Sequence, residues 1–259
     1  MRASVSSQHA MSIPRLFLDA PLSPGEEVPA LPGQGRYLGS VLRRGPGDPV
    51  VVFNGRDGEF AATVSTIRKD EARFTVGARL RAQPEPGGPQ LLLATIKRDA
   101  MEWVVEKATE LGVAAIQPVI TARCVADKVN LARLGLIARE AAEQCERLDI
   151  PAIADALPLH AALDRWDPAV PLFLLAERGA APALPVAAAR LAEEGRAMPV
   201  GLVTGPEGGF TPVELDAMRR RPFVVEAALG PRILRAETAA VSGLAVLQAI
   251  CGDLGHGRN

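Results

Sequence analysis

Three glycines, Gly205, Gly208 and Gly209, lie within five residues of one another near the C-terminal end of the chain. They follow the apolar run 200–203, which is expected to form a short buried strand. Because glycine has no side chain, the backbone of such a loop can approach a bound molecule closely. The stretch is therefore a candidate for holding a small ligand through main-chain groups.

A helix is expected to begin directly after this loop. Thr211 suits the N-cap, Pro212 suits the first helical position, and Glu214 completes a capping box with Thr211. The free amides at a helix start favour polar or anionic ligand groups. Strand, glycine loop and helix start together are the usual layout of a ligand site in an open α/β sheet.

Neither common nucleotide-binding motif fits the glycine loop. The segment GPEGGF at 205–210 lacks the Lys-Ser/Thr of a P-loop, and its glycine spacing is not the G-x-G-x-x-G of dinucleotide-binding proteins. Taken alone, a glycine turn after a strand is more often an ordinary structural turn. The loop by itself leaves both interpretations open.

The cysteines and histidines do not indicate metal chemistry. Their spacing suggests neither a zinc site, nor a disulfide framework, nor a histidine-based triad. Cys145 lies on an apolar helical face, so it is expected to be a core residue. The residues concerned are Cys124, Cys145, Cys251, His9, His160 and His256.

Strands and helices are expected to alternate from residue 91 onward, which predicts a mostly parallel sheet covered by helices on both faces. Apolar positions at helical spacing predict the helices at 100–111 and 131–148, the last helix is apolar on nearly all sides, and apolar runs predict the strands. The expected strands are 91–96, 114–120, 172–176, 200–204 and 223–229, and the expected helices are 100–111, 131–148, 185–194, one after Thr211, and 239–251.

Residues 12–81 are expected to form a small β-rich domain. Strand patterns cover 49–53, 59–67 and 73–80, and 36–44 is a short helical candidate. The segment 82–90 is rich in proline and glycine, so it is expected to be an exposed linker to a second domain at 91–253.

Composition sets the remaining limits. The chain has 259 residues, 48% of them hydrophobic, and a net charge of −1, which is not typical of a general nucleic-acid binder. Residues 1–84 carry a net +3 and the rest −4, a weak bias that suits an RNA-facing N-terminal domain but also an ordinary surface. Without a signal peptide or a long apolar span, a cytoplasmic protein is expected, with flexible ends at 1–11 and 254–259.

Four motifs in this order resemble one known family. They are residues 101–112 (MEWVVEKATELG), 140–144 (EAAEQ), 205–214 (GPEGGFTPVE) and 229–239 (LGPRILRAETA). The chain resembles, from about Ile13 to Cys251, the bacterial small-subunit ribosomal RNA uridine-N3 methyltransferases (RsmE-like), of the SPOUT class. The resemblance implies a SPOUT-type knotted α/β methyltransferase domain, an N-terminal PUA-like β-barrel domain that binds RNA, and a homodimer. It also implies that 16S rRNA is the substrate. The modest charge of the chain favours rRNA within the assembled small ribosomal subunit, with free rRNA left open as the alternative.

The resemblance further implies that three strand-to-helix loops hold S-adenosyl-L-methionine. This cofactor carries its own activated methyl group, so no metal is required. Apolar side chains of the third loop are suited to sandwich the adenine ring, while main-chain groups read its edge. The implied cofactor-binding residues are Leu175, Glu177, Gly205, Pro206, Glu207, Gly208, Gly209, Leu229, Gly230, Pro231, Ile233 and Leu234.

Uridine methylation requires loss of the N3 proton and stabilisation of the resulting anion. Arg235 and Arg232 are candidates for stabilising that anion, Glu237 for accepting the proton, and Thr238 for a hydrogen bond to substrate or cofactor. Glu237 and Arg235 are equally well explained as a helix-start ion pair, and Glu207 as a residue that only shapes its loop.

Arginines are the candidates for contacting RNA phosphates. The expected substrate-binding residues are Arg15, Arg36, Arg43, Arg147 and Arg232. The segment 145–149 reads CERLD where the family usually carries asparagine and arginine, which weakens the case for Arg147. Two other functions remain open: methylation of another RNA such as tRNA, and a non-catalytic RNA-binding role in ribosome assembly.

Overall fold

The computed structural model describes residues 13–125, 128–175, 181–195 and 198–255. The chain divides into two compact units between Pro84 and Glu85, a point inside the predicted linker. The predicted flexible segments 1–11 and 256–259 lie outside the described residues, whereas Leu254 and Gly255 belong to the short 3-10 helix η2 (Asp253–Gly255). Within the described residues no helix is long and apolar enough to cross a membrane.

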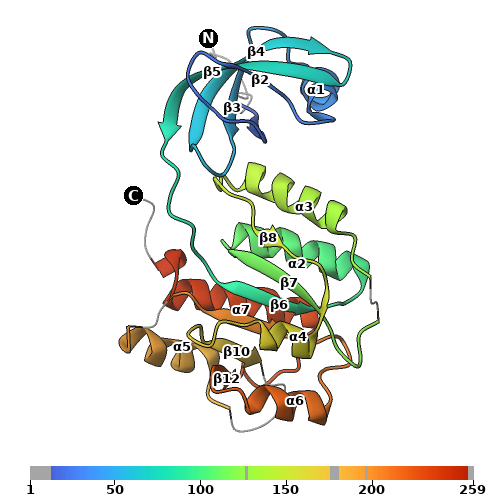
Figure 1. Cartoon of the computed structure of the whole chain (residues 1–259), viewed down its shortest axis with the longest axis vertical. Helices are drawn as coiled ribbons and strands as arrows, with labels where there is room; N and C mark the ends of the chain where they lie inside the picture. Colours follow the sequence, from blue (N-terminus) through green and yellow to red (C-terminus); the bar gives the residue numbers. More distant parts are fainter. Residues whose placement is uncertain (1–12, 126–127, 176–180, 196–197, 256–259) are drawn as a thin grey trace, which may run out of the picture. The chain divides into compact units, whose positions relative to one another are not determined.

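The first unit is built on a five-stranded sheet in the order β1-β3-β4-β5-β2. Only the β1–β3 pair is parallel, so this sheet is mixed. Alternate residues of β5, Ala72, Phe74 and Val76, are buried, which confirms the predicted period of two as far as Val76, whereas Leu80 is exposed. The strands are β1 (Arg15–Phe17), β2 (Glu27–Pro29), β3 (Pro49–Phe53), β4 (Glu59–Arg68) and β5 (Glu71–Arg81) (Figure 1).

The helix of the first unit lies earlier in the chain than predicted. It consists of α1 (Gln34–Arg36), continued by one π-helical turn, η1 (Tyr37–Val41), instead of spanning 36–44. The helix cannot continue to residue 44 because Arg43 has a φ of 53°, in the left-handed region. Leu38 is fully buried and anchors the helix in the core of this unit.

The second unit contains a parallel sheet in the order β12-β10-β11-β6-β7-β8, with β9 also paired to β7. Its central strands are buried on both faces, which explains their nearly continuous apolar sequences. The bounds are β6 (Gln90–Ala94), β7 (Ala115–Ile120), β8 (Ala152–Ile153), β9 (Leu157–Pro158), β10 (Leu172–Leu175), β11 (Gly201–Thr204) and β12 (Val224–Ala227).

Helices cover both faces of this sheet, as the sequence pattern predicts. On one face Leu91 and Leu93 of β6 pack with helices α2, α3, α5 and α7, and on the other face Leu92 belongs to a core shared with α4 and α6. The bounds are α2 (Arg98–Glu110), α3 (Leu131–Gln144), α4 (Leu159–Asp164), α5 (Leu184–Glu193), α6 (Pro212–Arg219) and α7 (Ala236–Ile250) (Figure 1).

The predicted C-terminal end of helix α3 is wrong. Helix α3 ends at Gln144 instead of reaching residue 148, because Glu146 has a φ of 64°. Cys145 is consequently half-buried at the end of the helix and is not a core residue. Leu148 is buried beyond the helix end, which is why the apolar periodicity continues past the last helical turn.

Candidate active site

A cavity of about 670 Å³ lies at the carboxyl ends of three neighbouring strands of the second unit. Leu175 lines it from the end of β10, Thr204 and Gly205 from the end of β11, and Leu229 from the loop after β12. The starts of α2 and α7 complete the lining. In open parallel sheets ligands bind outside the carboxyl ends of the strands, and this cavity occupies that position.

The strand order explains why the cavity forms here. β11 pairs with β10 on one side and with β6 on the other, while β12 pairs with the opposite edge of β10. The chain therefore runs from β10 toward one edge of the sheet, to β11, and from β11 toward the other edge, to β12. Such a divergence leaves room between loops at the strand ends.

The predicted glycine loop is a tight turn at the edge of this cavity. The Gly209 amide donates to the Pro206 carbonyl at 2.9 Å, and Gly209 has a φ of 66°, which favours glycine. A β-carbon on Gly205 would lie 3.2 Å from the Phe210 ring, so the ring packs directly over the backbone at this position. The small residues are therefore required by the shape of the turn itself.

Helix α6 begins with the predicted capping box. The Thr211 hydroxyl accepts from the Glu214 amide, and the Glu214 carboxylate accepts from the Thr211 amide at 2.8 Å. Burial opposes ionisation of Glu214. Its hydrogen bonds from Thr211 and Ala122 outweigh that burial and hold the pKa of the carboxyl below its ordinary value of 4.5.

Two other loops are fastened to the glycine loop by long-range contacts. The Arg123 guanidinium donates from Nη1 to the Gly208 carbonyl at 2.9 Å, and the Glu214 carboxylate accepts from the Ala122 amide at 2.8 Å. The Glu207 carboxylate accepts from the Lys97 amide at 3.2 Å. Neither Arg123 nor Lys97 was among the predicted site residues. Arg123 follows β7 and Lys97 follows β6, and this position after a strand is the sequence feature that could have identified them.

The third loop and the start of α7 form the other wall of the cavity. Gly230 has a φ of 94°, which again favours glycine, and the Ile233 side chain is 65% exposed in its loop. Arg235 is the N-cap residue of α7, and Glu237 lies in the first turn. No ion pair joins Arg235 and Glu237 among the residues that the structure describes, so the helix-start pair considered from the sequence is not formed.

Most of the predicted cofactor and catalytic residues meet at this cavity. Those that line it are Leu175, Gly205, Pro206, Glu207, Leu229, Gly230, Arg232, Ile233, Leu234, Arg235 and Glu237. Gly208, Gly209, Pro231 and Thr238 do not line it, and Glu177 lies outside the described residues. The sequence missed six lining residues, Lys97, Asp99, Ala100, Thr204, Ala236 and Ala239.

The lining combines apolar surface with balanced charge. Three basic side chains, of Lys97, Arg232 and Arg235, and three acidic ones, of Asp99, Glu207 and Glu237, surround leucine, isoleucine and alanine side chains. Such a lining suits a molecule that carries both charged groups and apolar surface. Among the described residues, no three histidine, cysteine, aspartate or glutamate side chains are grouped as metal ligands.

Arg15, predicted to contact RNA, is instead engaged within its own unit. Its Nε donates to the Glu59 carboxylate, and its guanidinium lies 3.8 Å above the Phe53 ring. Burial opposes ionisation of Glu59, but hydrogen bonds from Arg81 and Arg15 outweigh it and lower the pKa of that carboxyl. The Arg15 side chain is only 9% exposed, so a structural role is favoured.

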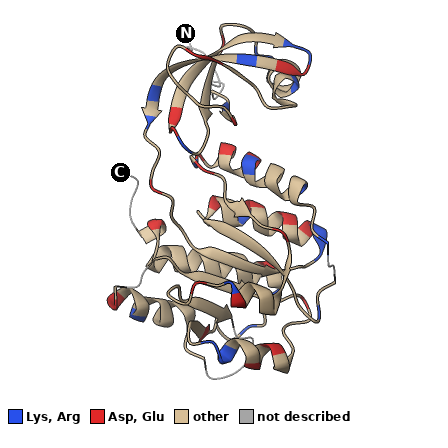
Figure 2. Cartoon of the chain, viewed as in Figure 1, with Lys and Arg blue, Asp and Glu red and all other residues tan. Residues whose placement is uncertain are grey.

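Arg147 is similarly engaged. Its guanidinium forms a two-point pair with Asp149 at 2.8 and 2.9 Å and donates to the Thr109 carbonyl at 3.1 Å. Only 10% of the side chain is exposed. The remaining predicted RNA contacts, Arg36, Arg43 and Arg232, are exposed, and basic and acidic residues are interspersed on the first unit (Figure 2).

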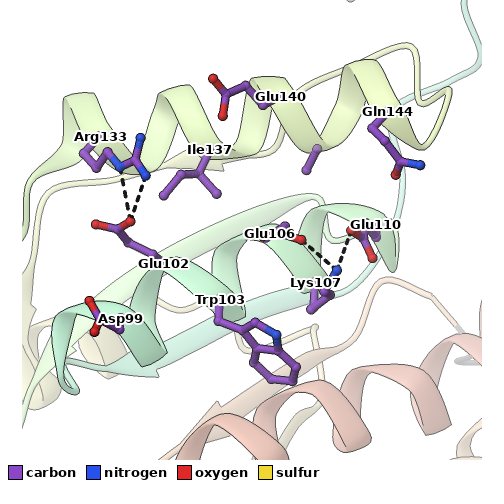
Figure 3. Close-up of a pocket in the computed structure, with 11 residues that line it drawn as sticks. Asp99, Glu102, Trp103, Glu106, Lys107, Glu110, Arg133, Ile137, Glu140 and Gln144 are labelled. Carbon is purple, nitrogen blue, oxygen red and sulfur yellow. Dashed lines mark hydrogen bonds and ion pairs between the residues drawn. The ribbon is translucent and has the colours of Figure 1, made fainter.

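A second hollow of about 750 Å³ lies between α2 and α3 (Figure 3). Arg133 pairs with Glu102 across it at 3.1 Å, and Lys107 bridges Glu106 and Glu110 at 2.7 and 2.8 Å. The predicted motif at 140–144 contributes Glu140, Ala141 and Gln144 to this hollow, not to the cavity. Its carboxylates outnumber its cations, which disfavours RNA phosphate, and the Arg133–Glu102 pair joins the two helices.

Comparison with known proteins agrees with this architecture. The RNA methyltransferase domain family matches residues 84–248, and the RNA methyltransferase PUA domain family matches residues 32–77. The chain is 30% identical over 241 residues to ribosomal RNA small subunit methyltransferase E of Rickettsia conorii, covering 93% of this chain and 97% of the relative. The chain belongs to the ribosomal RNA small subunit methyltransferase E family. The family protein of Bacillus subtilis is 28% identical over 247 residues, covering 90% and 95%.

Solved structures of relatives share the fold. The methyltransferase E of Neisseria gonorrhoeae, bound to S-adenosyl methionine, is 30% identical with a TM-score of 0.79, covering 93% of this chain and 99% of the relative. A methyltransferase of Legionella pneumophila with bound cofactor SAM is 31% identical with a TM-score of 0.80, covering 92% and 98%. The predicted SPOUT-type α/β fold with a PUA-like N-terminal domain is thereby confirmed, whereas the knot stays a prediction.

Proposed function

We propose that this chain transfers a methyl group from S-adenosyl-L-methionine to N3 of a uridine in small-subunit (16S) rRNA. The observation that carries the proposal is the cavity at the ends of β10 and β11, where apolar side chains and the Arg235–Glu237 helix start face one space. The cofactor bound to the relative from Neisseria gonorrhoeae and the name of that relative support it.

The lining residues fit the proposed cofactor. Leu229, Ile233 and Leu234 offer apolar surface to the adenine faces, and the main chain after β11 offers donors and acceptors. Thr204, which lines the cavity, carries a buried hydroxyl without a hydrogen-bond partner in the described residues, so this hydroxyl can still form a hydrogen bond. Bound S-adenosyl-L-methionine supplies an activated methyl on a sulfonium, and no metal is needed for that chemistry.

The residues at the start of α7 take the chemical roles in the proposed reaction. Glu237, half-buried in the first helical turn, accepts the N3 proton of uridine or orients a water that does so. Arg235, exposed at the N-cap position, donates to a uridine carbonyl oxygen and stabilises the anion, assisted by Arg232. Thr238 stays a proposed hydrogen-bond partner, although it lies outside the cavity lining. Positioning the two reactants contributes the largest share of the acceleration.

The remaining parts of the proposal concern partners. The PUA-like unit contacts RNA through exposed arginines such as Arg36 and Arg43. The substrate is the rRNA of the assembled small subunit, because a chain with a net charge of −1 gains little affinity for free RNA from charge alone. The protein acts as a homodimer in the cytoplasm, where its ribosomal substrate is found.

A direct test compares three acceptors in parallel: unmodified small subunits, free small-subunit rRNA and tRNA, each with labelled S-adenosyl-L-methionine. The product nucleoside is identified by mass spectrometry after digestion. N3-methyluridine in the assembled subunit is the expected result. Methylation of tRNA alone would mean that tRNA is the substrate, and it would still support the proposed cofactor site. Transfer to none of the three, despite cofactor binding, would favour an RNA-binding role in assembly.

A further inference from the structure

Thr204 is the last residue of β11 and, among the residues that the structure describes, one of the least exposed polar ones. It is 2% exposed, and within the described part of the chain its Oγ1 has no hydrogen-bond partner. A buried hydroxyl without a partner is unfavourable, so its position calls for an explanation. Thr204 also lines the cavity, which places a potential ligand next to this residue.

The direction of the Thr204 side chain follows from the alternation of β11. Leu202 belongs to the core shared with α7, and its side chain lies against Gly243 of that helix. Side chains two positions apart in a strand point to the same face, so Thr204 faces the same side as Leu202. The N-terminal turn of α7 lines the cavity on that side through Ala236 and Ala239. The Thr204 side chain therefore lies on the face of β11 that α7 covers, next to the cavity.

The surroundings explain why no side chain satisfies this hydroxyl. Leu175, Ala236 and Ala239, which line the cavity on this side, have no polar side-chain atoms. A valine would have nearly the same shape as threonine here and would leave no buried polar atom unpaired. The threonine hydroxyl is explained if a molecule in the cavity supplies its hydrogen-bond partner, since a hydroxyl can both donate and accept a hydrogen bond.

We propose that Thr204 Oγ1 hydrogen-bonds directly to the adenosine part of the bound cofactor and thereby contributes to its recognition. The inference rests on the proposed function for the nature of the cofactor. The adenosine part is the match because Leu175 and Leu229 line the same cavity as Thr204, and their apolar surface suits a flat base with polar edges.

The test compares two variants by calorimetric titration without RNA. Thr204→Val removes the hydroxyl and is expected to weaken binding of S-adenosyl-L-methionine about tenfold, the usual effect of one lost hydrogen bond. Thr204→Ser keeps the hydroxyl and is expected to retain most of the affinity. The melting temperature of cofactor-free Thr204→Val should equal or exceed that of the unmodified protein, because an unpaired polar atom is removed.

Thr109 offers a matched control. Its hydroxyl is equally buried but donates to the Val105 carbonyl within α2 at 2.8 Å, and it does not line the cavity. Thr109→Val should lower the melting temperature and leave cofactor affinity unchanged. Thr204→Val should therefore lower cofactor affinity without lowering stability, and Thr109→Val should lower stability without lowering cofactor affinity. A general destabilisation of the fold would not produce this difference.

Three ligands locate the contact. S-adenosyl-L-methionine, S-adenosylhomocysteine and 5′-methylthioadenosine share the adenosine part, so Thr204→Val should weaken all three by a similar factor. Unchanged affinity for 5′-methylthioadenosine, or unchanged affinity for all three, would overturn the inference. Failure of the unmodified protein to bind any of them would overturn the proposed cofactor and the Thr204 contact together, whereas binding without methyl transfer to rRNA would count against the proposed reaction alone.

Discussion

Glu214 caps the start of α6 and connects it to the loop after β7, so its replacement should have a large effect. Its carboxylate accepts from the Thr211 amide at 2.8 Å, the Thr211 hydroxyl at 2.9 Å and the Ala122 amide at 2.8 Å. Loss of the helix cap contributes about 1 kcal/mol and loss of the contact with Ala122 about 1 to 2 kcal/mol. We expect Glu214→Ala to lower the free energy of unfolding by about 2 to 3 kcal/mol.

The measurement is thermal unfolding followed by circular dichroism at pH 7. At roughly 2 to 4 °C per kcal/mol for a unit of this size, the melting temperature of Glu214→Ala should fall by about 4 to 12 °C. Glu193→Ala is the control, because Glu193 is an exposed glutamate at the end of α5 and its loss should matter little. If both variants melt within about 2 °C of the unmodified protein, the contacts of Glu214 do not stabilise the loop.

The pH dependence gives a second check on Glu214. Its pKa is lower in the folded protein than its ordinary value of 4.5, so the stability that it contributes is fully present above pH 4.5. That contribution is lost as the pH falls through the lower, folded-state pKa. Glu214→Gln cannot titrate, so the stability difference between the unmodified protein and this variant should be constant from pH 6 to 8 and shrink below pH 4.5. A difference that grows on acidification would refute the assignment.

Three further outcomes are expected. Arg235→Ala should lower kcat by about 10²- to 10³-fold while changing cofactor affinity little, and normal turnover would remove Arg235 from the mechanism. Gly201→Ala would place a β-carbon 2.3 Å from the Trp166 ring, so unfolding in denaturant should show a loss of about 1 to 3 kcal/mol; a neutral effect would mean that the ring moves freely. Arg36→Ala should raise the KM for RNA without changing the melting temperature. Arg15→Ala should lower the melting temperature, because Arg15 pairs with buried Glu59. The opposite pattern would mean that Arg15 contacts RNA and that Arg36 stabilises the fold.

The sequence predicted those parts of the fold that depend on neighbouring residues. The capping box of Thr211 and Glu214 and the strand Pro49–Phe53 were predicted at the observed positions, because each depends on a few adjacent side chains. Short elements such as β1 (Arg15–Phe17) were missed, since three residues are too few to show a period. The end of α3 was misplaced because Leu148 is buried for a tertiary reason after the helix has ended.

The candidate site was predictable only as far as its motifs reach. The loops after β11 and β12 were identified, but Arg123 was not, because it is 85 positions from Gly208 and meets it only through the order of the strands. Burial of a charged side chain is equally non-local. Arg147 was a reasonable RNA contact from its type, and only the structure places its guanidinium against Asp149 and the Thr109 carbonyl.

The contacts made by the glycine loop explain how a flexible sequence can form a defined site. Gly208 and Gly209 allow the tight turn, but glycine also leaves a loop free to move unless other groups hold it. Here Arg123 donates a hydrogen bond to the Gly208 carbonyl, Glu207 accepts one from the Lys97 amide, and Glu214 accepts one from the Ala122 amide. The partners of the last two lie 110 and 92 positions away along the chain. They follow β6 and β7, so the loop can be ordered only once the parallel sheet has brought these strand ends together. Formation of the site is therefore coupled to folding of the whole second unit, and the affinity for cofactor should depend on residues that never touch it.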